Sequence, residues 1–188
     1  MPLILTSGPA AEPVSLAEAK AHLRVDGADE DALIGSLVVA ARMHIEHALD
    51  LALITQSWSL YLDRFPDGPV ELPLGPVQAV TEVRLYAANA AVTVLTPDQY
   101  LLDAASRPAR LSPIGVWLQP GRAVNGVEIA FAVGYGATGA AVPQPLRQAI
   151  LMLIAHWHES REAASPEEQF EAPHALDALI APYRVSRI

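Results

Sequence analysis

The chain has 188 residues, of which 52% are hydrophobic, and its formal net charge is −9. This length allows one domain or a small core with one large insertion. The acidic balance and a single lysine, Lys20, argue against a nucleic-acid-binding surface, because phosphate contacts need clustered Lys and Arg. The chain has no cysteine, which excludes disulfides, thiol nucleophiles and Cys-ligated metals.

Residues 1–14 contain several prolines and are predicted to form an arm or loop. No basic segment precedes an apolar run here, so no signal peptide is expected. The longest strongly apolar run, residues 149–155, is too short to span a bilayer. These observations favour a soluble intracellular protein with no membrane partner.

A capping box marks the first predicted helix. Ser15 stands three residues before Glu18, so each side chain can bind the backbone amide of the other residue. The helix that follows is expected to end at residues 25–27, where an aspartate and a glycine break the apolar pattern.

A second helix is predicted over about residues 30–50, with Asp29 as its cap. Apolar residues at intervals of three and four define its core-facing side: Ile34, Leu37, Val38, Ala41, Ile45, Ala48 and Leu49. Arg42, Glu46 and Asp50 are expected on the opposite side of this helix.

The middle of the chain alternates apolar and polar residues with a period of two, which is typical of half-buried strands. Strands are predicted at residues 55–63, 70–72, 77–85, 100–103, 116–118 and 127–135. Prolines at the strand ends favour a small antiparallel sheet or partial barrel over a parallel sheet.

A long helix is predicted from about residue 143 to about residue 162. Leu151, Ile154 and Trp157 help to make it apolar nearly all round, and such a helix must be covered on several sides. Two alternatives remain for what packs against this helix. A neighbouring subunit would make Leu151, Ile154 and Trp157 interface residues, whereas the other helices and the sheet of the same chain would make them core residues.

These elements, with a loop at residues 163–173 and a short last helix, predict an α+β protein. Residues 1–53 and 141–188 are expected to form a helical bundle core. Residues 54–140 are expected to form an inserted antiparallel β-sheet or partial barrel.

No catalytic, cofactor-binding or metal site is predicted. His156 and Glu159 share a helix face, but the zinc-protease spacing of two histidines four residues apart is absent. His44 and His47 have no obvious third ligand. A solvated helix face is the favoured interpretation of both pairs. The alternative hypothesis is a metal-dependent enzyme with a small β-barrel site, using His156 and Glu159.

Several short motifs occur together in a characteristic order. They are SLAEAKAHLRVD at 15–26, DALI at 31–34, AAR at 40–42 with IE at 45–46, QSW at 56–58, LDRFP at 62–66, LPLGP at 72–76, PAR at 108–110, VGYG at 133–136, VP at 142–143, AIL at 149–151 and APYR at 181–184. This order resembles the head–tail connector, or adaptor, proteins of long-tailed phages, especially those of prophages and gene transfer agents. Residues 87–94 and 163–173 match poorly.

The resemblance implies a structural protein that forms a ring, expected to be twelve-fold, under the portal of a capsid. A tail-completion or stopper protein would attach below, and DNA would pass through the channel without specific binding. It also implies that the C-terminal segment docks into the portal, here through Tyr183, Arg184, Val185, Arg187 and Ile188. We then expect the chain in the bacterial cytoplasm during assembly and later at the head–tail junction of a virion or gene transfer agent particle.

Overall fold

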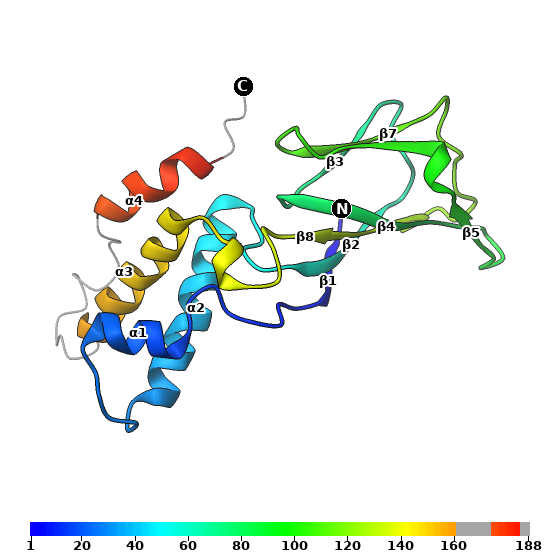
Figure 1. The fold of residues 1–188 in the computed structure, drawn as a ribbon. Coiled ribbons are helices and arrows are strands. Elements are labelled where there is room, and N and C mark those ends of the chain that lie inside the picture. Colours follow the sequence, from blue (N-terminus) through cyan, green and yellow to red (C-terminus); the bar gives the residue numbers. More distant parts are fainter. Residues whose placement is uncertain (161–173, 185–188) are drawn as a thin grey trace. The chain divides into compact units, whose positions relative to one another are not determined.

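The computed structural model describes residues 1–160 and 174–184, which fold into two compact units. The β unit comprises Met1–Pro9 and Thr55–Gly134, and the helical unit comprises Ala10–Ile54 and Tyr135–Ile188 (Figure 1). The predicted α+β fold, with antiparallel sheet inserted between helical segments, is confirmed.

The boundary between the units differs from the predicted one at both ends. Met1–Pro9 belong to the β unit, because β1 (Leu3–Ser7) pairs with β2 (Gln56–Leu62) in an antiparallel manner. β1 is an edge strand with mostly exposed side chains, so its sequence shows no alternation of apolar and polar positions. At the other end, residues 135–140 belong to the helical unit.

The first helix of the helical unit, α1 (Leu16–Leu23), begins with the predicted capping box. The Glu18 amide donates to Ser15 Oγ over 3.2 Å, and the Ser15 amide donates to Glu18 Oε2 over 2.9 Å. α1 ends at Arg24, whose backbone is left-handed with φ 58°. α2 (Asp31–Leu49) has Glu30 at its N-cap, so the prediction of Asp29 as the cap is wrong.

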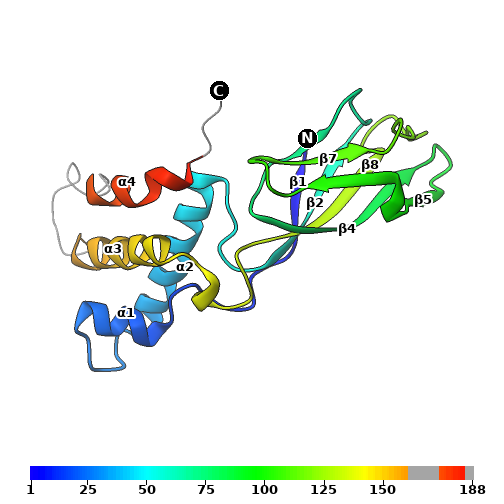
Figure 2. The same cartoon turned by 45° about the horizontal axis from the view of Figure 1, so that its top comes forward.

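The central helix of this unit is α3 (Gln144–Ser160), which contacts α1, α2 and α4 (His174–Ile180). Figure 2 shows α3 between α1 and α4, with α2 behind it. The core is made chiefly by α2 and α3, through Ile34, Val38, Ala41, Ile45 and Leu49 and through Leu146, Ala149, Ile150, Leu153 and Ile154. The other helices therefore cover α3 on several sides, which explains its apolar pattern.

The β unit contains two antiparallel sheets that lie one over the other (Figures 1 and 2). The larger sheet has the order β1-β2-β8-β4-β5, with β8 at Val127–Val133, β4 at Val77–Tyr86 and β5 at Val92–Leu95. The smaller sheet has the order β3-β7-β6, with β3 at Val70–Leu72, β7 at Ala109–Pro113 and β6 at Tyr100–Asp103. Val127, Ile129, Phe131 and Val133 of the central strand β8 are fully buried.

Five of the six predicted strands are confirmed, as β2, β3, β4, β6 and β8. The prediction of a strand at residues 116–118 is wrong: Val116 is 94% exposed, and Trp117 stacks on Phe65 with ring centroids 4.0 Å apart. β5 and β7 were not predicted. β7 follows Pro108 and ends at Pro113, and prolines are turn signals in a sequence. Its pairing with β3 and β6 is visible only in three dimensions.

Candidate functional site

Two histidines in or beside the pairs that were considered as metal ligands, His44 and His158, make other contacts. His158 Nε2 lies 2.8 Å from Glu30 Oε2, and the His44 ring meets the Trp157 ring edge-on with centroids 5.9 Å apart. Within residues 1–160 and 174–184, no group of three or more His, Asp or Glu side chains could hold a metal ion. His156 and Glu159 therefore have no assembled ligand set in this part of the chain.

The β unit carries a pocket of about 730 Å³ next to the N-terminus and the end of β2. Its lining contains no His, Lys or Ser, and its acidic side chains are Asp63, Asp67 and Glu71. Asp63 in this lining accepts a hydrogen bond from the Asn125 amide over 2.9 Å, which joins two loops of the β unit. The pocket offers no observation that favours an enzyme.

A charged network lies inside the helical unit around Arg42. Its guanidinium lies 2.6 Å from Glu46 Oε2 and 2.8 Å from Glu12 Oε2. Burial of the guanidinium lowers the pKa of Arg42, but the two carboxylates outweigh burial and raise that pKa above its ordinary value. Arg42 is therefore a buried cation that is held by two anions.

The same network anchors the segments that lead from one unit into the other. Glu46 Oε1 accepts the Leu53 amide over 2.8 Å, and the Leu53 carbonyl accepts the Tyr135 amide over 3.2 Å. Glu12 ties the incoming N-terminal segment to Arg42. Each of the three places where the chain passes between the units thus has a nearby hydrogen bond in the helical unit.

α2 presents an outer side that differs from the predicted one. Arg42 and Glu46 were expected on the side opposite the core, yet their side chains are only 10% and 12% exposed. They turn inward because each finds an opposite charge, which is the condition for burying an ion. Among the exposed residues of α2 are Leu33, Ser36, Val39, Ala40, Met43 and His47, a set that we call the α2 outer face.

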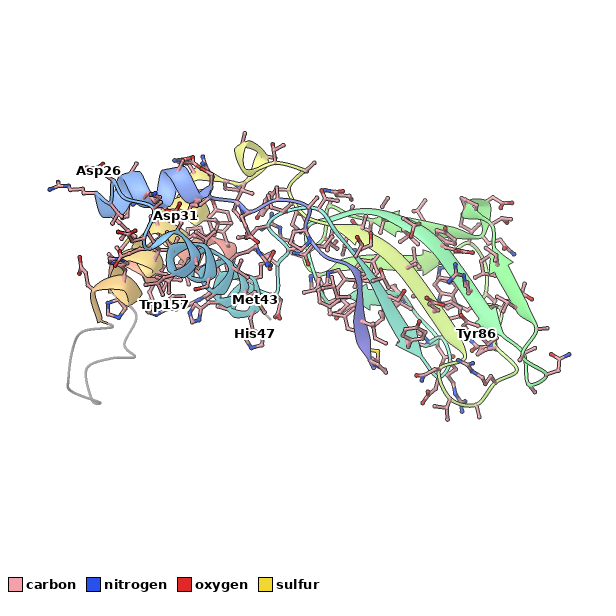
Figure 3. The ribbon with its side chains drawn as sticks, turned by 90° about the horizontal axis from the view of Figure 1, so that it is seen from below. Asp26, Asp31, Met43, His47, Tyr86 and Trp157 are labelled. Carbon is pink, nitrogen blue, oxygen red and sulfur yellow. The ribbon has the colours of Figure 1, made fainter. Side chains whose placement is uncertain are left out.

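By length and composition, α2 is the one helix in the described ranges that could cross a membrane. A core helix passes the same test, and 33% of the α2 window is buried inside the protein. A paired arginine and glutamate in the middle of α2 fit a core helix better than a membrane span. The large exposed apolar residues of α2, Leu33, Val39 and Met43, lie on its outer face, where Met43 and His47 are seen along one side (Figure 3).

The three residues predicted as an oligomer interface fall into two groups. Ile154 is 0% exposed within the helical core, so it has no surface to offer a neighbour, because α1, α2 and α4 already surround α3. Leu151 and Trp157 are partly buried and pack against the edge of the same core. An interface role therefore stays a prediction for Leu151 and Trp157 only.

The predicted portal-docking segment is described only at its start. Tyr183 is partly buried against the helical core, and Arg184 pairs with Asp177 over 2.8 Å on the surface. Val185, Arg187 and Ile188 lie outside the described residues, as does the loop at 163–173. Their role in docking stays a prediction.

A second buried charge, Glu128 on β8, lies in the larger sheet and was not singled out from the sequence. It accepts hydrogen bonds from Tyr86 over 2.6 Å and Ser59 over 2.9 Å, and Arg84 lies 3.3 Å away. Burial raises the pKa of Glu128, but the hydrogen bonds from Tyr86, Ser59 and Tyr61 and the contact with Arg84 outweigh it and lower that pKa. Register could have revealed this cluster, because Glu128 stands opposite Tyr61 on one side and Arg84 on the other.

A family model described as phage gp6-like head-tail connector protein matches residues 13–91. Among curated protein sequences, none matches this chain.

Solved structures match over the whole chain. One is a chain in the neck of an empty GTA particle computed with C6 symmetry, with 31% identity and a TM-score of 0.83. Another comes from the virion of a native gene transfer agent (GTA) particle, with 30% identity and a TM-score of 0.82. A third comes from the neck of a native GTA particle computed with C12 symmetry, with 30% identity and a TM-score of 0.81. Each match covers 100% of this chain and 97% of the other chain.

A two-unit α+β fold, shared over its full length with chains of particle necks, defines a structural connector protein. The chain belongs to the phage gp6-like head–tail connector family. The resemblance drawn from the sequence motifs is thereby confirmed, including its gene transfer agent branch.

Proposed function

We propose that this protein is the adaptor that forms a ring on the portal of a phage-like particle and joins the capsid to the tail. The observation that carries the proposal is the match over 100% of the chain, at 31% identity, to a chain in a particle neck. A match of this extent includes both units, so it supports the role of the whole chain and not of one module alone.

Ring formation is supported by the C6 and C12 symmetries of the neck structures that contain similar chains. A cyclic ring closes only if one surface of each subunit fits a different surface of its neighbour. We expect a dodecamer in the particle, with Leu151 and Trp157 near the contact between subunits.

Within this ring, the C-terminal segment would contact the portal protein through Tyr183, Arg184, Val185, Arg187 and Ile188. A tail-completion or stopper protein would bind on the opposite side of the ring. The surface pair of Arg184 and Asp177 is weak, so Arg184 can exchange its partner for a portal acid at little cost.

DNA would pass through the ring without specific binding. The net charge of −9 per subunit, repeated around a channel, repels phosphate and lowers the tendency of DNA to stick to the wall. The protein would assemble in the bacterial cytoplasm and remain at the head–tail junction of the finished particle.

The test is removal of this gene from a producing strain, followed by electron microscopy of the particles. We expect capsids without tails, and we expect a plasmid copy of the gene to restore tailed particles. A variant that ends after Arg184 is expected to restore fewer tails, because it lacks part of the portal-docking segment. Normal tailed particles in the deletion strain would contradict the proposal.

Metal analysis tests the enzyme alternative directly. Protein purified without chelators is expected to contain no stoichiometric metal, because no group of three or more ligating side chains occurs in the ranges 1–160 and 174–184. One metal per chain, lost on replacing His156, would favour an enzyme over an adaptor.

A further inference from the structure

The α2 outer face lacks the charges that a solvent-facing helix normally carries. Between Ala32 and Leu49, the charged residues are Arg42 and Glu46, which form an ion pair with side chains that are only 10% and 12% exposed. Asp31 at the start of α2 is paired with Lys20. The chain as a whole is acidic, with a net charge of −9, so the lack of charge is a local feature of this helix side.

The residues of this face also have a regular spacing. Leu33, Ser36, Ala40, Met43 and His47 follow one another at alternating steps of three and four, and all five are exposed. This is the spacing of a seam along which a second helix packs. Large side chains at Leu33 and Met43, which are 38% and 57% exposed, flank small ones that allow close approach of a second backbone.

The chemistry of the face selects the kind of partner. It carries no Lys or Arg, so it does not suit the phosphates of DNA. The opposite side of α2 packs on α1 and α3, so lipid could reach only one side of the helix. A narrow apolar seam of this kind fits the helix of another protein subunit.

We propose that the α2 outer face binds a helix of a second copy of this chain, as one half of the contact between neighbouring subunits in the ring. The inference rests on the proposed adaptor function, because similar chains occur in necks computed with C6 and C12 symmetry, where identical copies adjoin. The face meets a different surface of the next copy, since a ring cannot close through self-pairing of one face.

The first test replaces Met43 by glutamate in the strain that carries the plasmid copy. A charge placed in a dry helix seam without a partner opposes association. We expect the number of tailed particles to fall about tenfold or more. The isolated Met43→Glu protein should keep its thermal unfolding midpoint, because Met43 is exposed in the single chain. Val116→Glu, at an exposed valine of the β unit, is the matched control and should leave tailed particles at the wild-type number.

The second test uses the absence of natural cysteine in the chain. Met43→Cys is labelled with a benzophenone maleimide, incorporated into particles and irradiated. We expect a covalent product with the mass of two copies, and peptide mapping should place the second attachment site away from residue 43.

Two results would overturn the inference and leave the adaptor function standing. One is a wild-type number of tailed particles with Met43→Glu. The other is a photoproduct in which the label joins the portal, a tail protein or lipid instead of a second copy. By contrast, normal tails in the deletion strain would contradict the adaptor function itself.

Discussion

Arg42 and Glu46 lie one turn apart on α2, and the guanidinium Nη1 is 2.6 Å from the carboxylate Oε2 inside the helical unit. The pair faces inward and leaves the exposed side of α2 without charge. Glu46 also accepts the Leu53 amide, so a single carboxylate joins α2 to the segment that leads into the β unit.

Loss of this carboxylate should destabilise the protein strongly. Glu46→Gln leaves the buried Arg42 with Glu12 as its remaining anion, and we expect the free energy of unfolding to fall by about 3 kcal/mol. Glu12→Gln is the control and should cost about 1 kcal/mol, because Glu12 is more exposed than Glu46. Urea unfolding followed by circular dichroism measures both values. Equal costs would show that Glu46 has no special role.

The capping box of α1 should contribute a measurable part of the stability of the helical unit. Ser15→Ala removes the acceptor of the Glu18 amide, and we expect a loss of about 1 kcal/mol. Ser36→Ala is the matched control, since Ser36 lies within α2 and binds only the Leu33 carbonyl. Thermal unfolding should place Ser36→Ala within about 0.5 kcal/mol of wild type. A loss for Ser15→Ala that is no larger would contradict the role of the cap.

Stability should decrease in acid because of Glu128. A glutamate in the unfolded chain has a pKa of about 4.3, and in the folded protein the pKa of Glu128 lies below its ordinary value. The ionised carboxylate therefore stabilises the fold above about pH 4.3, and this contribution is lost as the pH falls through the lower folded pKa. Unfolding measured between about pH 6 and about pH 3 should show a smaller decrease for Glu128→Gln than for wild type.

Tyr86→Phe should have an intermediate effect in the same pH series, because it removes one hydrogen bond to Glu128 and leaves the carboxylate in place. A Glu128→Gln curve that runs parallel to the wild-type curve would refute this assignment. It would mean that other carboxylates cause the acid sensitivity.

Gly126 should not tolerate a side chain. A Cβ at this position would lie 2.6 Å from the Arg122 carbonyl oxygen and 2.7 Å from the Asp63 carbonyl oxygen. Backbone atoms cannot move aside cheaply, so Gly126→Ala should cost about 2 kcal/mol. Gly27→Ala is the control, because nothing lies within 4 Å of a Cβ there, and it should stay within about 0.5 kcal/mol. Urea unfolding compares the two variants, and similar stabilities would contradict the crowding at Gly126.

Local sequence was sufficient for the secondary structure of most of the chain. The capping box at Ser15, the apolar period of α2 and the alternation in β8 act within a few residues, so they can be read without knowledge of the fold. The order of the short motifs was also sufficient to recognise the connector family. The edge strands were harder to predict, because β1 and β5 bury few side chains and owe their form to pairing with β2 and β4.

Only the folded chain shows which element covers each side of a helix. Periodicity shows that residues share a face, but it does not name the element that covers them. Ile154 is covered by helices of its own chain, and Arg42 is buried because Glu12, thirty positions away, supplies an anion. The predicted core side of α2 does face the core, but contacts with Glu12 and Glu46 also draw Arg42 inward and leave an uncharged outer side that periodicity did not predict.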